Sequence, residues 1–431
     1  MLSRPWQKSQ DSGTTGETAC PTELDQQFAS VVGQAFSLSR LLRRAITKPL
    51  PRGVAYGLVS ILLLLPVYWQ PRVHAGDLTR HLDNAWLARS IESGQALGVV
   101  LKGPPRLFDV ILAGLYHMAG AEFAQRLCIS LAVLTFIWGA FTFVSAVGGR
   151  KPWYLMPCIA MLAYGWVFHM GFFNFYLSMG LCFWALALGW NVQLRLAIIA
   201  AALMGLAYLA HPIPAIWTAE LFCYLWMARR AGAPRYIFVT AAGLVVIIAG
   251  SALANGTVHS GALVQIAGSV AADQMWVFDT KYYFVLIGLL LVWGLLFIAL
   301  MRRGGAGSVF SGLPFQLCML SAAAIFFLPS TVLIPGSPHI LVYYAERMSL
   351  GVGVCFCALL ATGQPRAFER CALVMLSLVF FCFLYGDERA RNSFEDQMMD
   401  TVARVSHHSS VFSRQLLAVK RTRGVDSATD N

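Results

Sequence analysis

Long apolar segments constrain the fold of this chain more than any other feature of its sequence. Most are close to the roughly 20 residues that a helix needs to cross the hydrocarbon core of a bilayer. Hydrophobic residues make up 58% of the 431 residues and charged residues only 12%. A spanning helix satisfies its backbone hydrogen bonds internally, so we predict an all-α, polytopic integral membrane protein. The twelve apolar segments are 54–69, 107–121, 127–147, 153–170, 172–190, 196–211, 213–228, 236–253, 282–300, 313–333, 346–362 and 371–385.

Clusters of Lys and Arg between these segments indicate how many of them cross, because basic loops favour the cytoplasmic side. If segment 107–121 crosses the membrane, every later basic cluster falls outside. If it lies in the membrane surface, all of them fall inside, and its short length and Asp109 near its start agree with that. We therefore predict about eleven transmembrane helices (range 10 to 12), with a cytoplasmic N-terminus and a C-terminus on the outer side.

The apolar segments also divide the chain. Residues 1–52 are polar and basic, and we expect a largely disordered cytoplasmic segment that is not a cleavable signal peptide. Residues 53–386 form the predicted transmembrane domain, with a first outer loop at 70–106. Residues 387–431 are expected to form a small C-terminal tail.

Charge, cysteines and motifs exclude other classes of protein. The formal net charge is +11, but Lys and Arg gather in short loops as topology requires, so we predict no nucleic-acid partner. Most of the ten cysteines lie inside apolar segments, as packed thiols do. The sequence contains no phosphate-binding P-loop, dinucleotide fingerprint, H-E-x-x-H or C-x-x-C motif. We expect no cofactor, and no carboxylate cluster indicates a metal site, although a divalent ion is compatible with the sequence.

The first outer loop carries the strongest chemical signal. On a helix at 100° per residue, His74, Asp77, His81 and Asn84 share one stripe, which predicts an amphipathic helix lying in the membrane plane. A carboxylate with a histidine one turn away can accept a proton from a hydroxyl group. Asp77 and His81 are therefore candidate catalytic residues, and the alternative is an amphipathic connector with solvated charges.

Four further residues are candidates for binding a substrate or its phosphate. Lys102 and Arg106 flank a Gly-Pro-Pro turn and can hold a phosphate or act as interfacial anchors. Asn174 lies in a tight, aromatic-rich hairpin, where it can bind a ligand or only the backbone. His211 precedes Pro212 at a helix interruption, so it either lines a site or caps the helix end.

The segment before a late apolar run adds two more candidates, His339 and Arg347. Arg347 is the best single candidate for holding a phosphate, because a guanidinium stays charged and offers forked donors. The alternative is an interfacial ion pair with Glu346. The predicted topology places all of these polar groups at or near the outer face, where a cavity or substrate path would account for them.

The segment from Asp77-Leu-Thr-Arg-His81 to Gly94, after an N-terminal anchor, resembles the first outer loop of the GT-C class of polytopic glycosyltransferases. Gly171-Phe-Phe-Asn174-Phe-Tyr-Leu is similar to a turn in bacterial membrane proteins of that general architecture, and the likeness covers about residues 50 to 390. It implies a polyprenyl-phosphate-linked sugar donor and a glycan or lipid acceptor. It also implies a site on the periplasmic face of a bacterial inner membrane, with Asp77 as the catalytic base.

The chain departs from commoner members of that class, which pair two acids in this loop. Asp83 is six residues from Asp77 and points away from it on a helix. The hypothesis is an inverting transfer of a sugar at the outer face. The alternatives are a lipid-linked saccharide flippase or other transporter, a polysaccharide polymerase, and a non-catalytic membrane scaffold.

Overall fold

The computed structural model describes residues 51–94, 106–190, 194–231, short stretches between 236 and 250, and residues 262–327, 332–333 and 340–404. The chain divides into two units, Met1–Ser60 and Ile61–Asn431, and the contacts below all lie within the second unit. Nearly all described residues are helical, and the prediction of an all-α chain is confirmed in this respect.

One small antiparallel strand pair precedes α16, with Val332 opposite Leu341. The bounds are α2 Arg52–Tyr68, α3 Leu78–Glu92, α4 Leu107–Ala119, α5 Ala121–Gly148, η1 Trp153–Leu155, α6 Met156–Ala163, α7 Trp166–His169, α8 Phe173–Trp190, α9 Leu194–Ala210, α10 Pro212–Ala231, α12 Ala262–Ser269, η2 Ala272–Met275, α13 Tyr282–Gly304, α14 Ala306–Ser311, α15 Leu313–Phe327, β1 Val332–Leu333, β2 Ile340–Leu341, α16 Tyr344–Ala361 and α17 Ala367–Ala403.

Among the described residues, five helices are long and apolar enough to cross a membrane by length and composition. They are α5, α8, α13, α16 and α17, and four shorter helices are also apolar. The apolar, membrane-length helices expected from the sequence are therefore present. The count of about eleven crossings and the in-plane orientation of the first-loop helix remain predictions.

The core is built around α5, α8 and α16, whose apolar side chains are mostly buried. Two glycines let α5 and α8 cross closely: a Cβ on Gly139 would lie 2.5 Å from the Gly180 carbonyl oxygen, and one on Gly180 would lie 2.8 Å from Phe136. Small residues at such crossings are typical of helices packed in membranes. The ring of Phe136 stacks on Tyr176 beside this contact, with centroids 4.6 Å apart.

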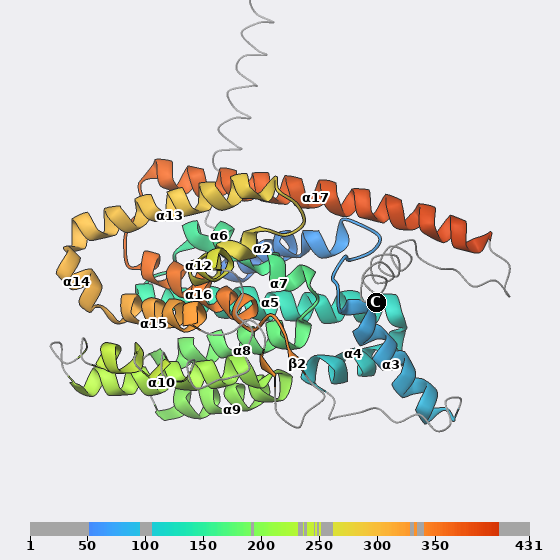
Figure 1. Ribbon diagram of the computed structural model, residues 1–431. Coiled ribbons are helices and arrows are strands. Elements are labelled where there is room, and N and C mark those ends of the chain that lie inside the picture. The colour runs from blue at the N-terminus through green and yellow to red at the C-terminus, as the bar shows by residue number, and fades with distance from the viewer. Residues whose placement is uncertain are drawn as a thin grey trace, which may run out of the picture. The chain divides into compact units, whose positions relative to one another are not determined.

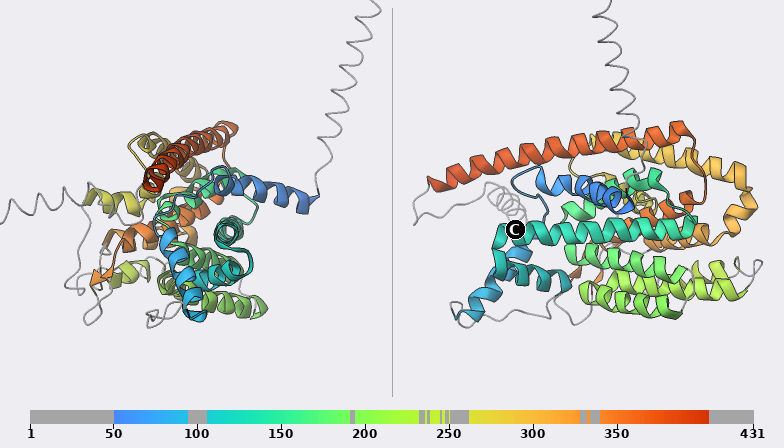
Figure 2. Two further views of the ribbon diagram at one scale, coloured as in Figure 1. Left: turned by 90° about the vertical axis from the view of Figure 1, so that its right-hand side faces the viewer. Right: turned by 180° about the vertical axis from the view of Figure 1, so that it is seen from behind.

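The other helices lie on two sides of α5. Figure 1 and the right-hand view of Figure 2 show α8, α9 and α10 on one side, and α13 and α17 on the other.

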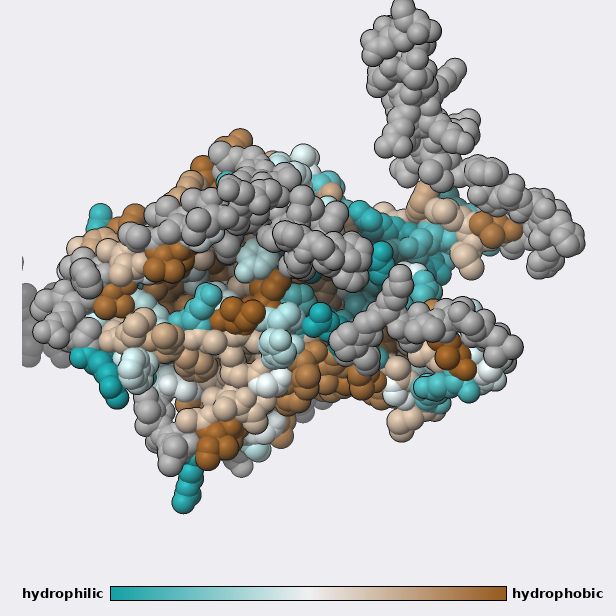
Figure 3. Space-filling view, turned by 60° about the horizontal axis from the view of Figure 1, so that its bottom comes forward, coloured by the Kyte–Doolittle hydropathy of each residue, from teal (hydrophilic) through white to brown (hydrophobic). Residues whose placement is uncertain are grey.

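Large apolar side chains also cover parts of the surface. On α13 they recur at helical spacing, with Phe284 75%, Ile287 54% and Leu291 64% exposed. Figure 3 shows hydrophobic residues over much of one face, with hydrophilic areas between them. An exposed apolar stripe along a membrane-length helix is what contact with lipid requires.

Helix α17 has an apolar first half and a polar second half that begins near Gly386. Its 37 residues correspond to about 55 Å at 1.5 Å per residue, well beyond the roughly 30 Å of a hydrocarbon core. The helix lies along α13 and extends past it (Figure 1). The tail boundary predicted at residue 387 therefore falls inside this helix, and the residues that follow it up to Ala403 are helical.

Candidate functional site

The segment that carries Asp77 is attached by its backbone to the turn between α7 and α8. Gly76 donates to the His169 carbonyl at 2.8 Å, and the Asp77 N–H donates to the Met170 carbonyl at 3.0 Å. Gly171 allows this approach, because its φ is +77° and a Cβ there would lie 2.5 Å from the Asp77 nitrogen. The turn thus fixes the backbone of Asp77 through contacts far apart in sequence.

Asp77 occupies the N-cap position of α3, but its side chain makes no capping hydrogen bond. Its carboxylate is 40% exposed and makes a long ion pair of 3.8 Å with Arg80, whose side chain is 80% exposed. Such an exposed pair holds its partners weakly. The carboxylate also lies close enough to Arg347 to interact with it electrostatically. The fixed backbone therefore presents a loosely held carboxylate whose charge acts on a second, half-buried cation, Arg347.

Arg347 lies in the first turn of α16, against aromatic rings. Its guanidinium carbon is 3.5 Å from the centroid of the Phe172 ring. Its Nε is buried and has no hydrogen-bond partner in the part of the chain that the structure describes. Phe172 in turn contacts Trp166 and Tyr343. A cation that is half-buried and only partly satisfied is a good receptor for an anionic group.

His211 lies in the break between α9 and α10, near the same cations. Its Nδ1 accepts a hydrogen bond from the Ile213 N–H at 3.3 Å, so the helix-capping role is present. Burial, followed by the positive charges of Arg347 and Arg106, lowers the pKa of His211 to about 3. The imidazole is therefore neutral at physiological pH, and the charges of Arg347 and Arg106 act on it.

His81 does not approach the Asp77 carboxylate but joins α3 to α4 and to the turn before α8. Its Nδ1 lies 2.5 Å from Asp109 Oδ1, and its Nε2 lies 3.3 Å from the Gly171 carbonyl oxygen. Both ring nitrogens thus have protein partners. The candidate catalytic role of His81 remains a prediction, and the contacts themselves describe a structural link.

Asn174 completes this link from α8. Its Nδ2 donates to Asp109 Oδ2 at 2.8 Å, and its Oδ1 accepts from the Phe108 N–H at 3.1 Å. Burial acts to raise the pKa of Asp109, but the hydrogen bonds from His81 and Asn174 prevail, and the pKa lies below its ordinary value. From the sequence, Asp109 indicated only that segment 107–121 lies in the membrane surface, and it was not predicted as a site residue. A lone acid in a short apolar segment is the signal that could have identified it.

The polar half of α17 holds the segment that leads into Asp77. Asn392 Oδ1 accepts from the Arg72 N–H at 3.0 Å, and Asn392 Nδ2 lies 2.9 Å from His74 Nε2. Arg72 also pairs with Glu395 at 2.8 Å, and Glu388 accepts a hydrogen bond from Trp69. Sequence reasoning missed these contacts between α17 and residues 69–74. The signal was the helical spacing of Glu388, Asn392 and Glu395 in the supposed tail.

Three predicted site residues remain: Lys102, Arg106 and His339. Lys102 and His339 lie outside the described residues. Arg106 is exposed at the start of α4, and its charge acts on His211. Among the described residues, no group of three or more His, Cys, Asp or Glu side chains could hold a metal ion. The structure therefore links Asp77, Arg347, His211 and Arg106 electrostatically, whereas His81 and Asn174 meet at Asp109.

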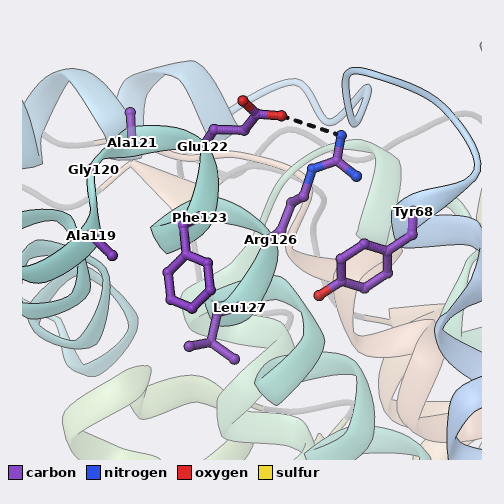
Figure 4. Close-up of a pocket in the computed structure, with 8 residues that line it drawn as sticks. All are labelled: Tyr68, Ala119, Gly120, Ala121, Glu122, Phe123, Arg126 and Leu127. Atoms are coloured by element: carbon purple, nitrogen blue, oxygen red, sulfur yellow. Dashed lines mark ion pairs between the residues drawn. The ribbon is translucent and has the colours of Figure 1, made fainter.

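Two well-formed cavities in the described part of the chain lie away from Asp77 and Arg347, which line neither of them. The first, of about 570 Å³, lies where α4 meets α5 (Figure 4). The second, of about 290 Å³, lies between α13 and the loop after α16.

Comparison with known protein families, with curated proteins and with solved structures gives no match in any of the three.

Proposed function

We propose that this chain is a multi-pass membrane glycosyltransferase that moves a sugar from a polyprenyl-phosphate donor to a glycan or lipid acceptor, with inversion. The observation that supports this most is a loosely held carboxylate, Asp77, whose charge acts on a half-buried, partly unsatisfied cation, Arg347. A base and a phosphate receptor are the two groups that such a transfer needs from the protein.

In the proposed reaction Asp77 takes the proton of the acceptor hydroxyl as its oxygen attacks the anomeric carbon. The bond between that carbon and the phosphate oxygen breaks, and its electron pair leaves with the lipid phosphate. Arg347 stabilises the negative charge that grows on this leaving group, and Arg106 adds positive charge nearby. Because His211 is neutral, it adds no charge to the phosphate site and can only donate or accept a hydrogen bond there.

Membrane placement brings the reactants together. A lipid tail holds the donor sugar at the depth of the outer headgroups, and the fixed Asp77 backbone orients the base toward it. The proposed setting is a bacterial inner membrane crossed about eleven times, with the N-terminus in the cytoplasm and the C-terminus in the periplasm. Lys102 and His339 are further proposed contacts to the donor.

Replacing Asp77 with Asn tests the role of the base. The measurement is the consumption of labelled polyprenyl-phosphate sugars by the purified protein in lipid. We expect Asp77→Asn to reduce consumption by about 100-fold or more, the range that a general base contributes. Asp83→Asn, an exposed acid on the same helix, should retain it. Wild-type activity in Asp77→Asn would remove the proposed role, and wild-type protein that moves the donor without consuming it would indicate a transporter.

A further inference from the structure

The larger cavity lies outside the cluster around Asp77 and Arg347. It is lined by residues from the end of α2, the end of α4 and the first two turns of α5. Gly120, with φ +82°, forms the corner between α4 and α5. The volume of the cavity, about 570 Å³, is within the roughly 300–1,000 Å³ typical of small-molecule sites. Because α5 is long and apolar enough to span a bilayer, a cavity at its end would lie at the level of lipid headgroups.

The polar lining of this cavity carries both signs of charge. Arg126, whose side chain is only 18% exposed, lies 3.7 Å from Glu122, which is 83% exposed. Figure 4 shows both side chains on the same side of α5. Within the described ranges, the Glu122 carboxylate is held by this long, solvated pair alone, so little free energy is lost when it turns toward another cation.

Arg126 is fixed in place by the chain around it. Its Nη2 donates to the Pro71 carbonyl at 2.6 Å and to the Gln70 carbonyl at 3.2 Å, and its guanidinium lies 5.5 Å from the Tyr68 ring centroid. Its Nη1 donates to the Val67 carbonyl at 3.4 Å. A guanidinium has five N–H donors, more than these three hydrogen bonds use. Arg126 is thus a positioned cation with donor capacity left for a phosphate.

The apolar lining continues down α5. Phe123 and Leu127 lie one turn apart and point to the same side in Figure 4. Leu131 follows at the same spacing, and Phe123 and Leu131 are 56% and 46% exposed. An exposed apolar stripe that begins at a pair of opposite charges matches a lipid, in which a hydrocarbon chain follows a charged headgroup.

We propose that this cavity binds a phospholipid whose headgroup carries a primary ammonium, with the phosphate on Arg126, the ammonium on Glu122 and an acyl chain along Phe123, Leu127 and Leu131. Glu122 disfavours a purely anionic headgroup. A quaternary ammonium cannot donate the hydrogen bond that a carboxylate accepts. The site is therefore selective among lipids through Glu122, and it requires no catalytic activity.

Native mass spectrometry of the full-length protein tests this, with phosphatidylethanolamine, phosphatidylcholine and phosphatidylglycerol titrated separately in detergent. We expect phosphatidylethanolamine to bind most tightly. Glu122→Gln should weaken its binding about threefold or more, as loss of an exposed charge pair implies, and should leave phosphatidylcholine binding unchanged. Equal affinities for the three lipids, or a preference for phosphatidylglycerol, would overturn the headgroup assignment.

A second pair of variants tests the location without disturbing Arg126. Ala119→Trp places a large side chain in the lining of the cavity, and Ala201→Trp places the same side chain on the exposed face of α9. We expect the first variant to lose phosphatidylethanolamine binding and the second to keep it, both with the thermal unfolding midpoint of the wild type. Unchanged phosphatidylethanolamine binding in Ala119→Trp, or equal loss of binding in both variants, would contradict the site.

Discussion

At the scale of single residues, the site depends on how Asp77 is presented rather than on the residues nearest to it in sequence. The sequence placed Asp77 and Arg347 in one candidate site, and in the structure the charge of Asp77 acts on Arg347. It also paired Asp77 with His81, because a helical stripe joins them, whereas His81 contacts Asp109 instead. A stripe on one helix says which residues share a face, but only tertiary packing decides which neighbouring element that face meets.

Gly171 is the residue whose substitution should disturb this presentation most. A Cβ there meets the Asp77 nitrogen at 2.5 Å, and the φ of +77° is unfavourable for alanine. We expect Gly171→Ala to destabilise the protein by about 1–3 kcal/mol, in the range of a strained backbone position. Gly114→Ala is the control, because its added Cβ meets nothing within 4 Å. Thermal unfolding measures both, and equal midpoints for the two variants would contradict the close contact.

His211 should make stability depend on pH. Its pKa is about 3 in the folded chain and about 6.5 when unfolded, so the unfolded state binds the extra proton first. Its contribution is complete above about pH 6.5 and is lost as the pH falls toward 3. The unfolding midpoint of the wild type should therefore fall more between pH 7.5 and 5 than that of His211→Gln. Parallel pH profiles for the two proteins would contradict the buried, neutral state.

At the scale of elements, the clearest difference between sequence and structure is α17. Its apolar half was predicted as the last apolar segment, but its polar half was assigned to a tail because hydropathy falls sharply at Gly386. Hydropathy identifies where a helix can meet lipid, and it does not show where the helix ends. The polar half continues as a helix because it buries Glu388 and Asn392 against the segment from Trp69 to His74.

Because the polar half of α17 contacts residues 69–74, we predict that Asn392 orders the segment before Asp77. Asn392→Ala removes the side-chain bonds to Arg72 and His74, and leaving buried polar groups unpaired costs about 1–3 kcal/mol. We expect faster hydrogen exchange at residues 72–77 in this variant. Gln397→Ala, an exposed position on the same helix, is the matched control. Unchanged exchange in Asn392→Ala would show that α17 does not hold the segment.

At the scale of the whole molecule, runs of apolar residues were enough to predict a helical chain with membrane-length helices. Local composition could not predict the tertiary links, such as the turn at Gly171 that holds Asp77 or the contact between Asp109 and Asn174. These links join residues 28 to 320 positions apart, and helical periodicity carries no information on such pairs. The sequence therefore points to candidate residues through their unusual charges, whereas it does not predict the contacts that hold them in place.

The central claim is that Asp77 acts as a base on a donor that other residues bind. The most direct test measures donor binding and donor consumption together, using Asp77→Asn and labelled polyprenyl-phosphate sugars. The proposed function predicts that this variant binds the donor within about threefold of the wild type, a difference of less than roughly 0.7 kcal/mol, yet no longer consumes it. Consumption at the wild-type rate, or loss of donor binding equal to the loss of turnover, would contradict it.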